Sequence, residues 1–274
     1  MLNKIIYKNK ILFFLLKKYW TINYFFNIFF VDSEKYFYMT KSQFNNQENI
    51  FLTYLSEYIE SKNFVEIGYF YREFNCVGLI QNNFSGKMVD ANMENKLNYF
   101  IMKKIIKKLK KEIQVIKRFI DLDNLDDIFD MNKLGCLSID IDGNDYWVLD
   151  KILSKKIIPE VIIAEYNSSF LDHEITIPYD KKLYHTDIKY SNPWYHGASL
   201  AAFNKLLSKH KYSLVKVIGG TNAIFVQEDL LNKTKLKKYL PSEIYEECIS
   251  RNEKSKNTAK EQFEAIKHLP LINI

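Results

Sequence analysis

The chain has 274 residues, of which 47% are hydrophobic and 26% are charged. This balance is typical of a folded globular protein and excludes a disordered or fibrous chain. The three cysteines, Cys76, Cys136 and Cys248, lie far apart in the sequence. They predict a reducing, cytoplasmic compartment and argue against a disulfide framework or a zinc site.

The net charge of +6 is concentrated in two segments, the first 18 residues and a run of six lysines within 103–111. In the second segment the lysines alternate with apolar residues at helical spacing, which favours the solvent-facing side of an amphipathic helix. The alternative is an anionic partner such as a nucleotide sugar or a lipid head group. We expect no nucleic-acid partner.

Residues 1–50 form a predicted helical extension that is basic and aromatic. Its apolar runs, 11–16 and 19–31, are interrupted by polar residues and are too short for a helix that spans a membrane. No small-residue cleavage site follows them, as a signal peptide would require. Two interpretations stay open: peripheral contact with a membrane through residues 1–31, or a helical layer packed on the domain.

From residue 51 onward, apolar periodicity predicts alternating helices and strands in one domain that ends near residue 229. Helices are expected over 51–59, 76–80, 94–111, 122–130, 146–153 and 198–210. Strands are expected over 64–68, 86–90, 113–120, 136–141 and 161–166, followed by a hairpin of 212–218 and 222–227. This alternation predicts an α/β fold with a mostly parallel sheet. Residues 230–274 form a predicted helical tail.

Acidic residues follow most of the predicted parallel strands, and right-handed crossovers place the carboxyl ends of those strands on one edge of the sheet. The carboxylates are those of Glu66, Asp90, Asp140, Asp142 and Glu165. Asp140 and Asp142 lie on the same face of their strand, and Gly143 lets the chain turn sharply after them. Ligands of open α/β sheets bind at this edge.

The stretch from Asn167 to Gly197 has no clear periodicity and contains His173, His185 and His196. Loops of this length are uncommon in compact domains and are often functional. It begins at the edge where the carboxylates are expected to gather.

With these elements in place, the chain resembles the FkbM-type family of S-adenosylmethionine-dependent methyltransferases between about residues 64 and 227. The similar segments are Val65–Gly68, Val89–Asn92, Leu137–Asp145, Ile162–Asn167 and Tyr195–Leu200. Leu137–Asp145 fits the family signature D-[VI]-[ED]-G-x-[ED]. The resemblance implies a Rossmann-like methyltransferase fold: seven strands, mostly parallel, a C-terminal antiparallel hairpin, and helices on both faces.

The resemblance also implies roles for individual residues. Glu66 and Gly68 belong to the loop beneath the methionine part of the cofactor, S-adenosylmethionine. Asp90 accepts hydrogen bonds from the two ribose hydroxyls, which one carboxylate can take together. Asp140 and Asp142 lie beside the methyl group and its acceptor.

The first loop departs from the family pattern E-x-G-x-G-x-G, because Phe70 and Arg72 replace the second and third glycines. Those glycines let the backbone approach a ligand closely. We expect a reshaped pocket in which Glu73 and Asn75 supply contacts. The alternative is a site that no longer binds the cofactor.

Methyl transfer requires in-line approach of a nucleophile, and a hydroxyl nucleophile benefits from a base or a metal ion. Asp140 and Asp142, with Glu165, are candidate ligands for Mg²⁺, or one of them is the base. Alternatively, Asp142 or Asp145 caps the next helix.

Among the histidines, His196 is the alternative base, although a structural histidine fits that position equally well. The spacing of the three loop histidines matches no metal-ligand pattern.

Three functions are therefore compared. The first is O-methylation of a hydroxyl on a small molecule or glycan, which the resemblance places on a sugar in surface-glycan assembly. The second is a glycosyltransferase in which Asp140-Ile141-Asp142 holds a metal ion and a nucleotide diphosphate. The third is a binding domain without catalysis. A hydrolase nucleophile elbow at Ser199 is rejected, because that motif requires a strand directly before it.

Overall fold

The protein is described here by a computed structural model that covers residue 22 and residues 43–71, 73–91, 98–129, 133–182 and 192–274. Apart from residue 22, the predicted N-terminal extension up to residue 42 lies outside the described residues, as do Arg72, the beginning of the helix expected at 94, and His185. No helix in the described part of the chain is long and apolar enough to cross a membrane.

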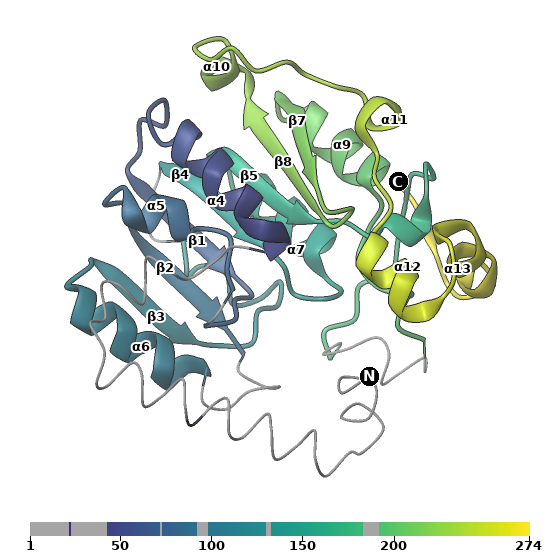
Figure 1. Cartoon of the computed structure of the whole chain (residues 1–274), viewed down its shortest axis with the longest axis horizontal. Coiled ribbons are helices and arrows are strands. Elements are labelled where there is room, and N and C mark those ends of the chain that lie inside the picture. The colour runs from purple at the N-terminus through teal and green to yellow at the C-terminus, as the bar shows by residue number, and fades with distance from the viewer. Residues whose placement is uncertain (1–21, 23–42, 72, 92–97, 130–132, 183–191) are drawn as a thin grey trace.

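A seven-stranded sheet in the order β3-β2-β1-β4-β5-β8-β7 forms the centre of the molecule (Figure 1). The first five strands are parallel, and β8 is antiparallel to both of its neighbours, β5 and β7. The bounds are β1 Asn63–Ile67, β2 Ser85–Asp90, β3 Ile113–Lys117, β4 Leu134–Ile139, β5 Pro159–Glu165, β7 Tyr212–Ile218 and β8 Asn222–Gln227. The predicted Rossmann-like sheet with a terminal antiparallel hairpin is confirmed.

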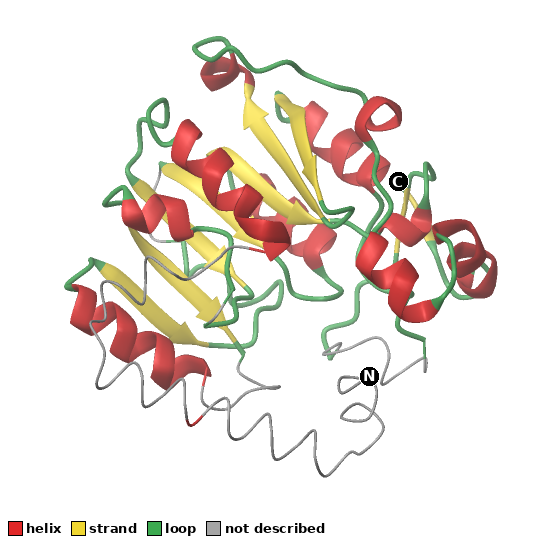
Figure 2. Cartoon of the chain, viewed as in Figure 1, coloured by secondary structure: helices red, strands yellow, loops and turns green. Residues whose placement is uncertain are grey.

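Helices cover both faces of this sheet, as expected (Figure 2). Successive residues of a strand point to opposite faces, so that Phe64 and Val65 of β1 belong to two different hydrophobic cores. The first core includes α4 Gln43–Leu55, α5 Val77–Gln81 and α6 Asn98–Leu109. The second includes α7 Asp145–Ser154 and α9 Leu200–Lys209.

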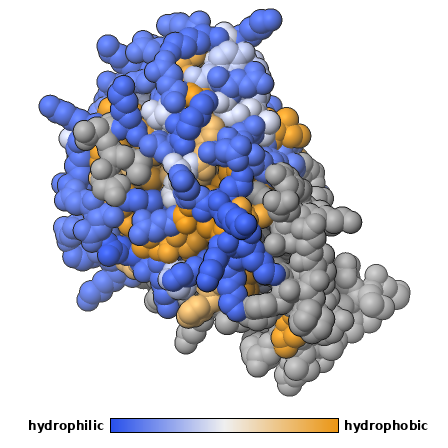
Figure 3. All heavy atoms as spheres, turned by 90° about the vertical axis from the view of Figure 1, so that its left-hand side faces the viewer, coloured by the Kyte–Doolittle hydropathy of each residue, from blue (hydrophilic) through white to orange (hydrophobic). Residues whose placement is uncertain are grey.

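Helix α6 confirms the prediction made for the lysine run. Ile101, Met102 and Ile105 are buried, whereas Lys103 and Lys107 are exposed. Figure 3 shows the face of the molecule at the β3 edge, which is mainly hydrophilic around a smaller apolar area.

The helix expected over 122–130 is wrong: the described part of this stretch forms turns. Side chains compete with the backbone here, because Asn124 Oδ1 accepts the N–H of Asp121 at 3.1 Å and Asp121 Oδ1 accepts that of Asp123 at 2.8 Å. Such local bonds stabilise turns at the expense of helices. The preceding strand accordingly ends at Lys117 rather than at Ile120.

The tail is helical in pieces, as predicted, and it packs against the loop that follows β5. Its elements are α10 Glu228–Leu231, α11 Pro241–Ile244, α12 Ile249–Ser255, α13 Ala259–Ile266 and β9 Ile272–Asn273. The loop contains a short 3-10 helix, η1 Ser168–Phe170, and a strand, β6 Ile175–Thr176, which pairs with β9. A third apolar cluster, with Phe170, Tyr195 and Ile266, joins the loop to α13.

Gln262 is the central polar connection between the tail and the loop. It is fully buried, its Oε1 accepts Ser169 Oγ–H at 2.6 Å, and its Nε2 donates to Asn252 Oδ1 at 2.7 Å and to the carbonyl of Asn257 at 2.9 Å.

We predict that Gln262→Ala lowers the free energy of unfolding by about 2–3 kcal/mol, because the buried Ser169 hydroxyl and two partly buried acceptors lose this partner. Urea denaturation measures the change. Gln47→Ala, an exposed position in α4, is the matched control and should change stability by less than about 0.5 kcal/mol. Equal effects of the two substitutions would contradict this account of the tail.

Candidate active site

The topology indicates a ligand site before any side chain is considered. Strands β2 and β3 follow β1 on one side, and β4 and β5 lie on its other side. The strand order therefore reverses between β1 and β4. Open α/β sheets bind ligands outside the carboxyl ends of the strands at such a switch point.

At this switch point, the backbone of Gly68 joins the ends of β1, β2 and β4. A Cβ atom on residue 68 would lie 1.5 Å from the carbonyl oxygen of Asp140, and the backbone has a φ of +78°. The N–H of Gly68 donates to Val89 O at 2.8 Å, and the N–H of Asp140 donates to Ile67 O at 2.9 Å. Only glycine fits at this position. The backbone contact therefore accounts for Gly68 independently of any role in binding a cofactor.

The turn after β4 is held by a buried carboxylate. Asp145 accepts the N–H groups of Ile141 at 2.7 Å and of Gly143 at 2.9 Å. Asp142 has a φ of +58°, in the left-handed region that aspartate tolerates better than most residues. The N-cap of α7 is Asn144, whose side chain makes no capping hydrogen bond to the helix, and the carboxylate of Asp145 instead stabilises the turn.

This turn brings Asp140 and Asp142 close to Glu165 at the end of β5. Carboxylate oxygens of the three residues all lie within 4.8 Å of one another, with Asp142 exposed and the other two half-buried. Burial, reinforced by the charges of Asp140 and Asp142, raises the pKa of Glu165 well above its usual range. In the described part of the chain, no other group of three His, Cys, Asp or Glu residues is arranged to hold a metal ion.

Glu66 holds the first loop closed. Its buried carboxylate accepts the N–H of Asn75 at 2.6 Å and that of Cys76 at 3.0 Å, at the start of α5. Asn75 is itself buried and donates to Ser138 Oγ of β4 at 3.1 Å. These two predicted cofactor residues thus shape the loop, and a direct contact of either with a cofactor stays a prediction.

The loop itself is built from aromatic residues. The backbones of Phe70 and Glu73 pair across a tight turn, with N···O distances of 3.3 and 2.8 Å. Tyr69 and Phe74 on either side are buried, whereas Phe70, which replaces a glycine of the family pattern, is 39% exposed. Glu73 is exposed, and its predicted role as a cofactor ligand is not tested by these contacts.

Asn98, at the beginning of α6, connects this loop to Asp90 at the end of β2. Its Oδ1 accepts the N–H of Tyr71 at 2.8 Å, and its Nδ2 donates to Tyr69 O at 2.8 Å and lies 3.5 Å from Asp90 Oδ1. Asp90 is half-buried at the edge of the sheet. The sequence contained no signal for Asn98, because the contact depends on how α6 packs.

Two further buried polar residues were also missed. Asn222 begins β8 opposite Glu165 in the sheet register. Its Nδ2 lies 3.0 Å from Glu48 Oε1 of α4 and 3.4 Å from Asn75 Oδ1. Asn222 and Glu48 are the two missed residues, and their contacts connect α4, β8 and the first loop.

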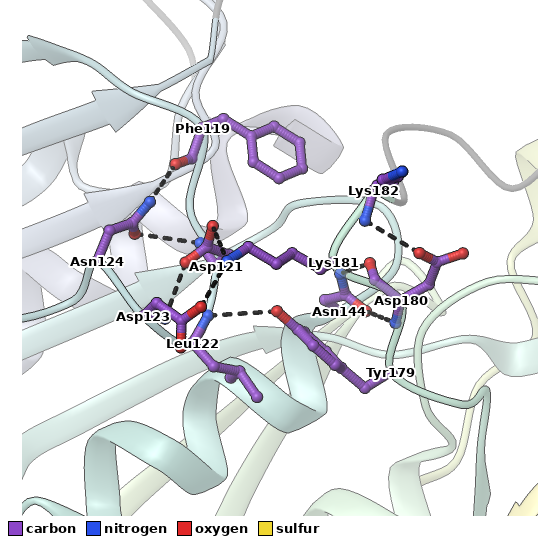
Figure 4. Close-up of polar contacts among 10 residues, drawn as sticks. All are labelled: Phe119, Asp121, Leu122, Asp123, Asn124, Asn144, Tyr179, Asp180, Lys181 and Lys182. Atoms are coloured by element: carbon purple, nitrogen blue, oxygen red, sulfur yellow. Dashed lines mark hydrogen bonds and ion pairs between the residues drawn. The ribbon is translucent and has the colours of Figure 1, made fainter.

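The loop after β5 contacts Asn144, which follows the turn after β4, and the turns after β3 (Figure 4). Asn144 Nδ2 donates to the carbonyl of Asp180 at 2.9 Å, and the indole of Trp147 donates to that of Ile177 at 2.8 Å. Lys181 forms an ion pair with Asp123 in the turns after β3.

The histidines of this loop do not come together in the described residues. His196 is buried, and its carbonyl accepts Asn167 Nδ2 at 2.8 Å, while its predicted role as a base is not tested. The ring of His173 stacks on Phe263 with centroids 4.5 Å apart. Ser199 Oγ caps α9 by accepting the N–H of Ala202 at 2.9 Å, which agrees with the rejection of a nucleophile elbow.

Two buried carboxyl groups in the site have raised pKa values. Burial raises the pKa of Glu66 to about 7 and that of Asp145 to about 6, although backbone N–H groups oppose both shifts. Each carboxyl therefore holds its proton more firmly in the native state than in the unfolded state. Their contribution to stability is fully present below the unfolded pKa and is lost as pH rises through the folded pKa.

We predict that the free energy of unfolding falls between about pH 4.5 and pH 7, with a loss on the order of 3 kcal/mol from Glu66 alone. Urea denaturation across this range measures it. Glu66→Gln should remove most of the Glu66 part of the decline, whereas the exposed control Glu253→Gln should retain it. A Glu66→Gln profile parallel to that of the unsubstituted protein would show that the shift is absent.

No family model matches the chain, and no curated protein matches it. Membership of the FkbM-type family therefore stays a prediction from the sequence motifs.

Solved structures of similar fold include an O-methyltransferase family protein from Burkholderia thailandensis, with 10% identity over 66% of this chain and 56% of that chain and a TM-score of 0.41. The O-methyltransferase from Bacillus cereus in complex with S-adenosylhomocysteine is 16% identical over 65% and 76% of the two chains, with a TM-score of 0.40. The N-terminal domain of EvdMO1 with S-adenosylhomocysteine bound is 9% identical over 67% and 82%, with a TM-score of 0.43. Likeness of this degree does not establish which ligand this chain binds.

Proposed function

We propose that this protein is an S-adenosylmethionine-dependent methyltransferase that acts on a hydroxyl group. The observation that carries the proposal is the set of carboxylates at the switch point of the sheet. Asp90 lies at the end of β2, and Asp140, Asp142 and Glu165 lie together at the ends of β4 and β5. Asp90 could accept hydrogen bonds from the vicinal diol of a nucleoside. The carboxylates at the ends of β4 and β5 could accept one from the hydroxyl that is methylated.

The residues at the end of β2 fit the ribose of the cofactor. Asp90 offers two acceptor oxygens at a half-buried position, which suits two neighbouring hydroxyl donors. Asn98 connects Asp90 to the backbone of Tyr69, whose buried hydroxyl has no hydrogen-bond partner among the described residues. We propose that the ribose diol can bind at Asp90 although the aromatic first loop lacks two glycines of the family pattern.

In the proposed reaction the cofactor supplies an electrophilic methyl group on a sulfonium. The chain orients the acceptor hydroxyl, and Asp140 or Asp142 accepts its proton. Asp145 keeps both carboxylates in place through the two backbone bonds described above. His196 is the other candidate for the proton acceptor. Positioning by these residues accounts for much of the expected rate.

The carboxylate triad also fits Mg²⁺, because its three donors are hard oxygen ligands. Asp140, Asp142 and Glu165 would hold the ion, whose charge would lower the pKa of an acceptor hydroxyl.

We predict that Mn²⁺, used as a probe for this site, binds the protein in isothermal titration, and that Asp140→Asn weakens binding at least about tenfold by removing one charged ligand. The exposed control Asp172→Asn should bind as the unsubstituted protein does. No heat of binding from the unsubstituted protein would remove the metal ion from the proposal and leave a carboxylate base.

The acceptor proposed from the family resemblance is a sugar hydroxyl on a small molecule or glycan. Residues 1–31, outside the described part of the chain, are proposed to bring the protein to the inner face of the membrane, where such acceptors are assembled.

We predict that S-adenosylhomocysteine binds with micromolar affinity and that Asp90→Ala weakens binding by at least about tenfold, because the ribose hydroxyls lose their acceptor. Isothermal titration measures both, with Asp172→Ala as the matched control.

If the unsubstituted protein does not bind this ligand, with or without Mg²⁺, the methyltransferase proposal is wrong. Binding of a nucleotide sugar with Mn²⁺ that is lost in Asp142→Ala would then indicate a glycosyltransferase. Binding of neither ligand would indicate a binding domain.

A further inference from the structure

The hydroxyl of Tyr69 differs from those of several other tyrosines in the described part of the chain. Tyr69 is only 6% exposed, yet its hydroxyl has no hydrogen-bond partner in the described part of the chain. Three buried tyrosines and the half-buried Tyr245 each donate to a backbone carbonyl: Tyr166 to Glu246, Tyr195 to Pro270, Tyr212 to Pro159 and Tyr245 to Ser168. A buried hydroxyl without a partner is costly, so a native structure that retains one needs a reason.

The backbone around Tyr69 is held firmly in place. Gly68 before it packs on Asp140, and the Phe70–Glu73 turn follows it. Its own carbonyl accepts Asn98 Nδ2, which also approaches Asp90. The backbone of Tyr69 is therefore held just after the end of β1 and is connected through Asn98 to Asp90 at the end of β2.

The titratable groups whose charges act on the Tyr69 hydroxyl are, in order of effect, those of Asp90, Tyr99 and Glu66. Burial raises the pKa of Tyr69 strongly, and the charge of Asp90 raises it further. The hydroxyl therefore keeps its proton at neutral pH and is available as a donor. Asp90, in contrast, offers acceptor oxygens.

We propose that the Tyr69 hydroxyl donates a hydrogen bond to a ribose hydroxyl of the bound cofactor, opposite the Asp90 carboxylate. This inference rests on the proposed function and adds a residue that the sequence motifs do not contain. A ribose hydroxyl donates one hydrogen bond and accepts another, so it can be held by Asp90 and Tyr69 at once. Phe70 replaces one of the glycines of the family's first loop, and the proposed contact with the ribose comes from the side chain of the neighbouring Tyr69.

The test compares two Tyr→Phe variants by isothermal titration with S-adenosylhomocysteine and by thermal unfolding of the free protein. Tyr69→Phe should weaken binding about tenfold, the effect of one lost hydrogen bond, and should leave the melting temperature unchanged or raise it. Tyr212→Phe is the matched control: it removes the bond to Pro159 O and should lower the melting temperature while leaving the affinity unchanged.

The same titrations with the 2′-deoxy and 3′-deoxy analogues of S-adenosylhomocysteine identify the ligand atom. For the analogue that lacks the contacted hydroxyl, Tyr69→Phe should bind as tightly as the unsubstituted protein, because the interaction is already missing. A tenfold loss that persists with both analogues would overturn the ribose contact.

The outcomes separate this inference from the proposed function. If the unsubstituted protein binds S-adenosylhomocysteine and Tyr69→Phe binds it equally well, the inference alone is wrong. A lower melting temperature of free Tyr69→Phe would also overturn it, because the hydroxyl would then have a partner within the protein. If the unsubstituted protein does not bind the ligand, both fail.

Discussion

The arrangement of the site depends on the contact between the backbones of Gly68 and Asp140. No side chain separates the ends of β1 and β4 there, and the hydrogen bonds from Gly68 to Val89 and from Asp140 to Ile67 tie three strand ends into one edge. The carboxylates of Asp90 and Asp140 extend from this edge on either side of the switch point. A displacement at residue 68 would therefore move both halves of the proposed site relative to each other.

Two buried carboxylates then shape the chain that leaves this edge. Glu66 gathers the N–H groups at the end of the first loop, and Asp145 gathers those of the turn after β4. Both are held where burial disfavours their charged forms. Their burial therefore lowers the stability of the protein at neutral pH. The same two carboxyl groups accept backbone N–H groups of the loops, which would have no partners in a purely apolar interior. These bonds hold in place the segments that carry the carboxylates of the proposed site.

Much of the fold could be predicted from the sequence, because apolar strands that end in acidic residues are local patterns. The parallel arrangement of the first five strands follows from βαβ connectivity, and the closeness of Asp140, Asp142 and Glu165 follows from the shared edge. The helix expected over 122–130 failed because the bonds of Asp121 and Asn124 to nearby backbone outweigh helical propensity.

Other parts could not be predicted, because they depend on contacts between distant segments. Nothing in the local sequence indicates that Asn98 reaches Tyr69, that Glu48 meets Asn222, or that β9 pairs with β6. Such long-range polar contacts produce no periodic pattern and no fixed residue spacing in the sequence. Their residue types are common in loops and helix ends, where most have no such role.

The pairing of β6 with β9 has a consequence for the order in which the molecule matures on the ribosome. The loop after β5 is translated well before its partners in α13 and β9, which come from the last part of this sequence. Until those residues emerge, the apolar side chains of Phe170 and Ile175 lack part of their cover. The edge formed by β1, β2 and β4 can be completed before α13 and β9 are translated, whereas the loop after β5 gains these partners only once that later part of the chain has emerged.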